Sequence, residues 1–332
     1  MKSKDTRKTG FDKFKNILDI WATNSEEGGW NISSTDEGSQ KMLEDESEKQ
    51  VKIQMGSDVV DDFVIDEDTS DDERMIVNMG PQHPSTHGVL RLQAELEGEV
   101  VRRVKPIIGY LHTGMEKTGE ELNYFQGPTN TTRMDYLSPL FNELVFSLTT
   151  EKLIGIEVPE RAKTIRILMT ELNRISSHLV ALATGCMDIG ALSMMIFGFR
   201  ERELILNFFE KTTGLRMNHN YIRPGGVAAD LPDGWQKDVK EILKVIPEKL
   251  QDYDDMLLDN PIWKGRLQNV GILTTEECFA YGITGPSLRA SGYEWDLRKS
   301  QPYSGIENYD FEIPVLKEGD VFAKWRLSLI HI

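Results

Sequence analysis

A run of apolar residues at intervals of three and four constrains the fold of this chain more than any other feature. The run begins after Pro159, and its members are Ala162, Ile165, Leu168, Leu172, Ile175, Leu179 and Leu182. This spacing places one apolar stripe along a long helix. The proline before the run and Gly185 after it are typical of a helix start and a helix end.

Two further segments have helical spacing. One spans Phe199–Thr213 and stops at Gly214. The other begins near Pro232, and we expect it to kink or break at Pro247. Its apolar residues are Trp235, Val239, Ile242 and Ile246. Together with the first helix they predict a helical bundle.

The region before the helices has a different period. From Val89 to Leu96 the residues alternate, Glu97-Gly98 follows, and a second apolar run begins at Val100, which predicts a β-hairpin with a tight turn. Thr274-x-x-Glu277 is a capping-box pattern before a short helix. Strands first and helices afterwards indicate an α+β fold, with an N-terminal hairpin-containing region followed by a helical bundle.

Residues 1–74 differ in composition from the rest. They hold 10 Lys and Arg against 20 Asp and Glu, a net charge of −10 out of −16 for the whole chain. Residues 11–21 have helical spacing, but the region offers little apolar surface to offset the entropy of ordering. We interpret 1–74 as an acidic, mostly disordered extension, with a docking arm for a partner as the alternative.

Charge and cysteine usage exclude several classes of protein. A strongly acidic chain argues against nucleic acid as a partner, because phosphate binding needs a basic surface. Cys186 and Cys278 form no CxxC pair, so this chain cannot supply the four ligands of an iron–sulfur cluster, and each reads as a small core residue. No signal peptide and no apolar run of membrane-spanning length occur, so membrane association would come through partners.

Polar residues gather in a loop at 80–88 that contains His83 and His87. Its prolines and glycines predict an irregular backbone. A His-x3-His metal site is a weak signal here, because no third ligand is in view and Pro84 disfavours a helix. Two exposed histidines without a role are the alternative, and we predict no metal.

Three other residues are candidates for chemistry. Tyr136 could donate a hydrogen bond or pack as a core aromatic. Asp188 could orient a histidine or cap the next helix, and capping is the preferred interpretation. Arg223, in the rigid loop Tyr221–Gly226, could face an anion or a cofactor, or cap a helix end. The nucleotide-binding and nucleophile-elbow motifs GxGxxG, P-loop and GxSxG are all missing.

Five strings together resemble one family. They are NMGPQHPSTHGVLRL, EKLIGIEVPERAKTIRILMTELNRISSHL, MDIGA, NYIRPGGVAADLP and WDLRKSQPY. In this order they closely resemble the 49-kDa subunit, or D subunit, of NADH-quinone oxidoreductase (respiratory complex I). The resemblance runs from about Met75 to Asp320.

The resemblance implies a place in an assembly. It implies a domain over 75–320, similar to the large subunit of nickel–iron hydrogenases, in a proton-translocating enzyme at the cytoplasmic side of the cell membrane. The expected partners are the B and C subunits and the membrane arm. The substrate is a quinone, menaquinone or ubiquinone, and the terminal four-iron four-sulfur cluster belongs to the B subunit. This chain itself shows no nicotinamide site.

The resemblance also implies roles for individual residues. His87 and Tyr136 would hold the quinone carbonyls, and Asp188 would pair with His87. Arg133 would lie near the terminal cluster. By position, His83 and Arg223 are expected near the quinone or the cluster.

The likeness to hydrogenases is incomplete, and three departures qualify the resemblance to the 49-kDa subunit. Hydrogenases have an R-x-C-G-x-C motif, and Arg133–Ser138 lacks both cysteines, so no nickel site survives. Asn218 stands where many relatives have His, which suggests a low-potential quinone, and Thr113 replaces an Arg of some relatives. Residues 321–332 are off-pattern, and we expect truncation or a frameshift there. A structural scaffold without quinone chemistry is the alternative function.

Overall fold

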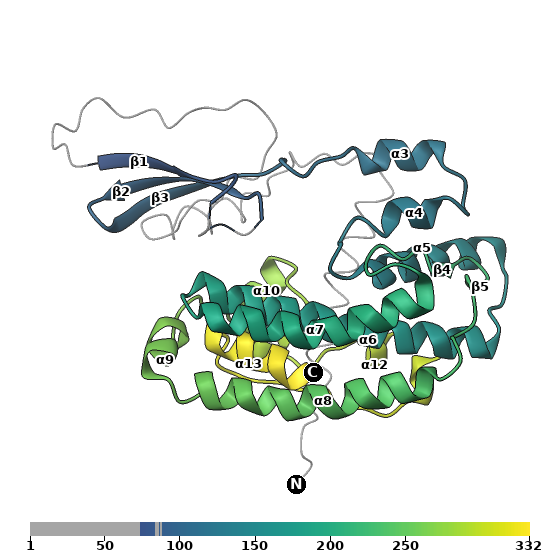
Figure 1. The fold of residues 1–332 in the computed structure, drawn as a ribbon. Coiled ribbons are helices and arrows are strands. Elements are labelled where there is room, and N and C mark those ends of the chain that lie inside the picture. The colour runs from purple at the N-terminus through teal and green to yellow at the C-terminus, as the bar shows by residue number, and fades with distance from the viewer. Residues whose placement is uncertain (1–73, 84–85, 87) are drawn as a thin grey trace, which may run out of the picture. The chain divides into compact units, whose positions relative to one another are not determined.

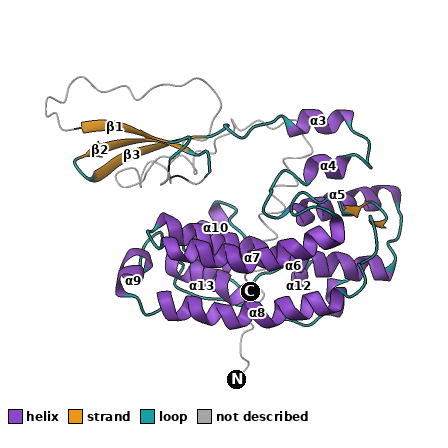
Figure 2. Ribbon diagram, in the orientation of Figure 1, coloured by secondary structure: helices purple, strands orange, loops and turns teal. Residues whose placement is uncertain are grey.

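The computed structural model describes residues 74–83, 86 and 88–332. The predictions for residues 1–73 and for His87 therefore fall outside the described residues. Two compact units are present, divided at residues 78/79, 91/92 and 106/107. Figure 2 shows strands concentrated in the first unit and a mostly helical second unit. This mixed architecture of a small sheet and many helices agrees with the predicted α+β class.

The first unit is built on a three-stranded sheet. Its strands, in the order β1-β2-β3, are Arg74–Met79, Arg91–Glu97 and Val100–Ile107. The two-residue turn between β2 and β3 places Gly98 at φ 59°, a left-handed conformation that glycine adopts readily. The predicted hairpin is confirmed. Glu95 pairs with Arg74 at 3.1 Å and with Arg103 at 3.8 Å, so ion pairs link it to both neighbouring strands.

The second unit is a helical body. Its helices are α3 (Met115–Glu121), α4 (Gly127–Thr131), α5 (Pro139–Ile154), α6 (Glu160–Asp188), α7 (Leu192–Thr213), α8 (Trp235–Leu257), α9 (Pro261–Leu267), α10 (Thr275–Ala280), α11 (Gly285–Ala290), α12 (Leu297–Ser300) and α13 (Val321–His331). A short antiparallel pair, β4 (Ile222–Arg223) and β5 (Gly226–Val227), and the 3-10 helix Ile306–Asn308 complete it.

Helices α6 and α7 pack along each other, and α8 packs against α7 (Figure 1). A Cβ on Gly198 of α7 would lie only 2.7 Å from the Cβ of Ala183 of α6, so glycine permits this close approach. The predicted stripe of α6 forms much of the core, with Leu172 and Leu179 almost completely buried. Phe209 of α7 and Ile242 of α8 pack into the same cluster.

Several predicted helix boundaries differ from the structure. Helix α6 continues through Gly185 to Asp188, and α7 begins at Leu192 rather than Phe199, although it ends at Gly214 as predicted. Helix α8 is not broken at Pro247. Pro247 lies on the exposed side, one turn after exposed Leu243, so the carbonyl that loses its partner can face water.

The predicted capping box is confirmed. The Thr274 hydroxyl accepts from the Glu277 amide at 3.2 Å, and the Thr274 amide donates to the Glu277 carboxylate at 2.7 Å. Residues 321–331 form helix α13, and its Trp325 packs edge-on against Trp263 at 5.4 Å between ring centroids. In the part of the chain that the structure describes, none of the helices is long and apolar enough to cross a bilayer.

Candidate functional site

The segment between α4 and α5 presents four consecutive exposed side chains, from Arg133 to Tyr136. Tyr136 is 47% exposed. The alternative that Tyr136 is a core aromatic is therefore wrong. Its phenol is available to a ligand or a partner.

The backbone of this segment is held firmly although its side chains are exposed. On α6, the Asn173 amide donates to the Leu137 carbonyl at 3.0 Å, and its oxygen accepts from the Leu140 amide at 3.2 Å. Asn142 donates to the Asp135 carbonyl at 3.0 Å. These bonds lie on both sides of Tyr136, so the loop is pre-organised.

A second polar loop, residues 218–226, is fastened to α5 by two buried carboxylates. Glu143 accepts from the amides of residues 220, 221 and 222 at 2.6, 2.8 and 2.9 Å. Glu151 accepts from the Gly225 amide at 2.8 Å. The two glutamates are eight residues apart on one helix, so they share a face.

Arg166 of α6 completes this attachment. Its side chain is fully buried and pairs with Glu151 at 2.5 Å. It also donates to the carbonyls of Gly226 and Arg223 at 3.0 and 2.8 Å. The backbone of Arg223 is thereby fixed, while its own side chain stays exposed and donates to the Asn220 carbonyl at 3.0 Å.

Asp188 is the last residue of α6 and is exposed. It does not cap the next helix, because the N-cap of α7 is Ala191 and no side chain caps it. The preferred capping interpretation is therefore wrong. Ser177, which contacts Ser138 at 3.3 Å, marks where the Tyr136 segment meets α6. Asp188 lies eleven residues further on, roughly 16 Å along the helix axis.

His83 is exposed, and its carbonyl accepts from the Thr86 amide at 3.1 Å. The loop begins at Gly80, where a Cβ would lie 2.1 Å from the Leu90 carbonyl oxygen, so only glycine fits. His87, the expected partner of Asp188, is not among the described residues. The structure thus joins Arg133 and Tyr136 on one loop, while the His87–Asp188 pairing stays a prediction.

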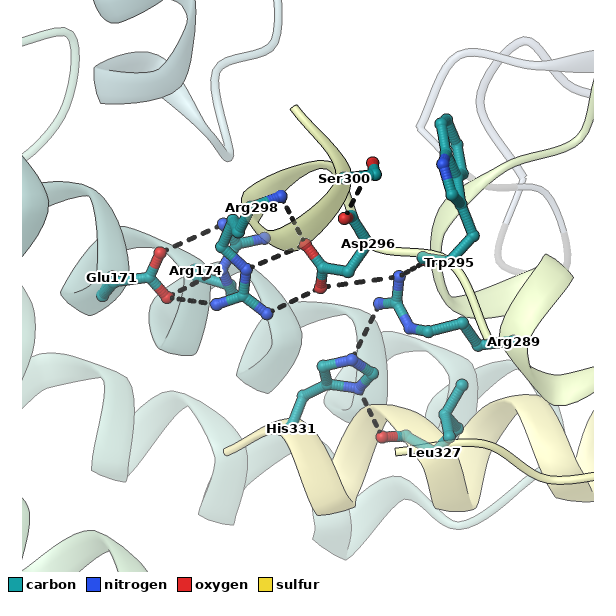
Figure 3. A network of polar contacts seen from close by, with 9 residues as sticks. All are labelled: Glu171, Arg174, Arg289, Trp295, Asp296, Arg298, Ser300, Leu327 and His331. Atoms are coloured by element: carbon teal, nitrogen blue, oxygen red, sulfur yellow. Dashed lines mark hydrogen bonds and ion pairs between the residues drawn. The ribbon is translucent and has the colours of Figure 1, made fainter. Parts of the chain in front are cut away.

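The WDLRKSQPY string has a structural role (Figure 3). Arg298 binds Asp296 at 2.8 Å and Glu171 of α6 at 3.0 Å, and Arg289 donates to the Trp295 carbonyl at 3.0 Å. Burial alone would raise the pKa of Asp296, but the hydrogen bonds and charge of Arg298 and the charge of Arg289 lower it to about 2. This network fastens the segment to α6.

Among the described residues, no three His, Cys, Asp or Glu side chains gather in a group that could hold a metal ion. Cys186 and Cys278 are both buried free thiols.

Sequence reasoning missed Glu143, Glu151 and Arg166. The signal was present in part: Arg166 lies next to Ile165 of the apolar stripe, and helices rarely bury such groups without a partner. The partners are distant in sequence, so the pairing itself was not visible.

Comparison with known proteins places the chain among respiratory-chain NADH dehydrogenase subunits. Residues 188–330 match the family described as respiratory-chain NADH dehydrogenase, 49 Kd subunit. This match extends ten residues past Asp320, the limit of the resemblance in the sequence analysis. The chain belongs to this 49-kDa subunit family.

Curated relatives are named as the D subunit of NADH-quinone oxidoreductase. That of Mycobacteroides abscessus is 54% identical over 285 residues, 85% of this chain and 66% of the relative. That of Rhodococcus jostii is 59% identical over 260 residues, 78% and 59% of the two chains. A D subunit of Salinispora arenicola is 57% identical over 267 residues, 80% and 60%. The chain thus spans about 60% of the length of the curated relatives that it matches.

Proposed function

We propose that this chain is the subunit of an NADH-quinone oxidoreductase that forms the quinone-reducing pocket. The supporting observation is the rigid loop that presents Arg133 and Tyr136 to the surroundings of the chain. An exposed phenol on a fixed backbone is suited to donate a hydrogen bond to a quinone carbonyl. The substrate is menaquinone or ubiquinone.

Reduction of a quinone to a quinol takes two electrons and two protons. In this proposal the electrons come from NADH through a four-iron four-sulfur cluster held by the neighbouring B subunit. Tyr136 donates to one carbonyl, and His87, oriented by Asp188, donates to the other. Arg133 lies toward the cluster, with His83 and Arg223 at the margin of the pocket.

The assembly follows from the same family. We propose the B and C subunits and the membrane arm as partners, with the chain held peripherally at the cytoplasmic side of the cell membrane. Proton translocation and the hydrogenase-like fold belong to this proposal. A scaffold role without quinone chemistry is the competing function, and the exposed, pre-organised Tyr136 favours the pocket.

The test is quinone reduction in membranes that carry the full complex with Tyr136→Phe. Removing a proton donor in the transition state is expected to lower the rate on the order of 100-fold. Transfer of electrons from NADH to ferricyanide reports on the upstream steps and should not change. Tyr281→Phe, another exposed tyrosine, is the matched control. Equal quinone reduction by Tyr136→Phe and wild type would favour the scaffold.

A further inference from the structure

Glu143 joins two loops that are far apart in sequence. Its side chain is fully buried. One carboxylate oxygen accepts from the Thr132 hydroxyl and the Asn220 amide, both at 2.6 Å. The other accepts from the amides of Tyr221 and Ile222 at 2.8 and 2.9 Å.

These contacts satisfy a carboxylate completely. Burial raises the pKa of Glu143, and the hydrogen bonds from Thr132 and from the three amides oppose that rise. The amides can only donate, so an amide nitrogen in place of either oxygen would face at least one donor. Four donors offset the cost of burying the carboxylate, so this site is built for a carboxylate.

The two loops are the ones that carry candidate site residues. Thr132 directly precedes Arg133 and the Tyr136 segment, and the three amides directly precede Arg223. We propose that Glu143 is a positioning residue for quinone reduction, which holds these two loops in register. This inference rests on the proposed function of the site.

Glu151 shows why a purely structural role does not account for Glu143. Glu151 and Arg166 already fasten the loop around Gly225 and Gly226 to α5 and α6. Their hydrogen bonds among the described residues do not reach the Tyr136 segment. The bond to Thr132 is what Glu143 adds, and it connects one side of the site to the other.

Thr132→Val tests this link, because valine has nearly the same shape and replaces the hydroxyl with a methyl group that cannot donate a hydrogen bond. In the full complex we expect kcat/KM for the quinone to fall about tenfold, since small displacements of catalytic groups are costly. KM should rise and kcat fall, while NADH-to-ferricyanide transfer keeps its wild-type rate. Thr132→Ser, which restores the hydroxyl, should recover most of the activity.

Thr150→Val is the matched control. Thr150 lies on α5 and is buried like Thr132, but among the described residues its hydroxyl bonds only to the Phe146 carbonyl of its own helix, at 2.9 Å. If loss of a buried hydroxyl acted only through structure, quinone reduction and NADH-to-ferricyanide transfer would fall together, in Thr132→Val and in Thr150→Val alike. Wild-type quinone kinetics in Thr132→Val would overturn the proposal.

Glu143→Gln and the double variant with Thr132→Val complete the test. If Thr132 acts through Glu143, the double variant should be no worse than Glu143→Gln alone, and additive losses would overturn the proposal. Should Glu143→Gln fail to assemble, the Thr132→Val result decides. Tyr136→Phe distinguishes failure of the positioning role from failure of the proposed function. If Tyr136→Phe lowers quinone reduction while Thr132→Val has wild-type kinetics, only the positioning role of Glu143 is rejected. If Tyr136→Phe reduces quinone at the wild-type rate, the proposed function is rejected.

Discussion

At the scale of single residues, burial controls the chemistry of the two cysteines. Cys186 and Cys278 have no exposed surface. Desolvation raises the pKa of Cys186 to about 12. Because the thiolate is the reactive form, Cys186 is inert in the native fold.

We therefore expect neither cysteine of the native chain to react with iodoacetamide at a pH of about 8, whereas both react after denaturation. Mass spectrometry of the labelled chain measures this directly. Labelling of Cys186 at the rate of a free thiol before unfolding would show that the core around α6 opens readily.

His219 is buried in its neutral form. Its Nδ1 donates to the Leu215 carbonyl at 3.0 Å, and its Nε2 has no hydrogen-bond partner among the described residues. Desolvation lowers the pKa of His219 to about 4, against a weaker opposing effect of the Leu215 carbonyl. Between about pH 6.5 and pH 4 the unfolded chain therefore binds a proton at this position that the folded chain does not.

His219→Gln should remove this source of acid sensitivity. As pH falls from 6.5 to 4, the wild type is expected to lose up to about 3 kcal/mol more stability than the variant. Urea unfolding of both chains at several pH values measures the difference, in which contributions of other histidines cancel. Parallel stability curves would contradict a neutral, buried His219.

The sequence offered candidate site residues, but it did not predict how their loops are held. Tyr136 and Arg133 were candidates, but their exposure depends on bonds from Asn173, thirty-seven residues beyond Tyr136. Glu143 was not a candidate at all, because a charged residue in a helix is normally on the surface. Its partners at 220–222 are distant in sequence, so no local sequence pattern indicated the contact.

At the scale of elements, local sequence signals predicted a helix boundary correctly where the backbone conformation or a cap at that position sets the boundary. The left-handed Gly214 ends α7 and the Thr274 capping box starts α10, as predicted. Gly185 and Pro247 did not stop their helices, because tertiary packing on both sides outweighs the cost of about 1 kcal/mol for a glycine and about 3 kcal/mol for a proline inside a helix. Cys186 beyond Gly185, and Tyr253 beyond Pro247, are both buried in the core.

Arg166→Met should strongly destabilise the junction of α5, α6 and the 218–226 loop. The substitution leaves the buried Glu151 carboxylate without its charge partner, and breaking a buried pair in this way costs about 3–5 kcal/mol. Urea unfolding monitored by circular dichroism measures the loss.

Arg161→Met, five residues earlier on α6, is the matched control. Arg161 pairs with Asp230 at 2.8 Å, but both side chains are more than half exposed. Solvent screening makes such pairs weak, so little change is expected. Similar losses in the two variants would show that the buried pair contributes no more than the exposed one.

At the scale of the whole molecule, the core belongs to the helical body. The main cluster of buried hydrophobic residues extends from Leu140 to Leu329, and its described members all lie in the second unit. The part of a chain that buries most of the apolar surface determines its cooperative unfolding transition. The helical body should therefore fold without the sheet.

A fragment of residues 107–332 tests this expectation. It should keep the helical circular dichroism of the second unit and unfold in one transition, with a midpoint close to the main transition of the full chain.

A control fragment of residues 107–234 lacks α8 and with it Ile242, Ile246 and Tyr253, which are buried in the cluster. Removing several large core side chains costs about 2–5 kcal/mol for each, more than a domain of ordinary stability can lose. The shorter fragment should therefore show no cooperative transition. If 107–332 also unfolds without cooperativity, the helical body depends on residues before 107 and the expectation is wrong.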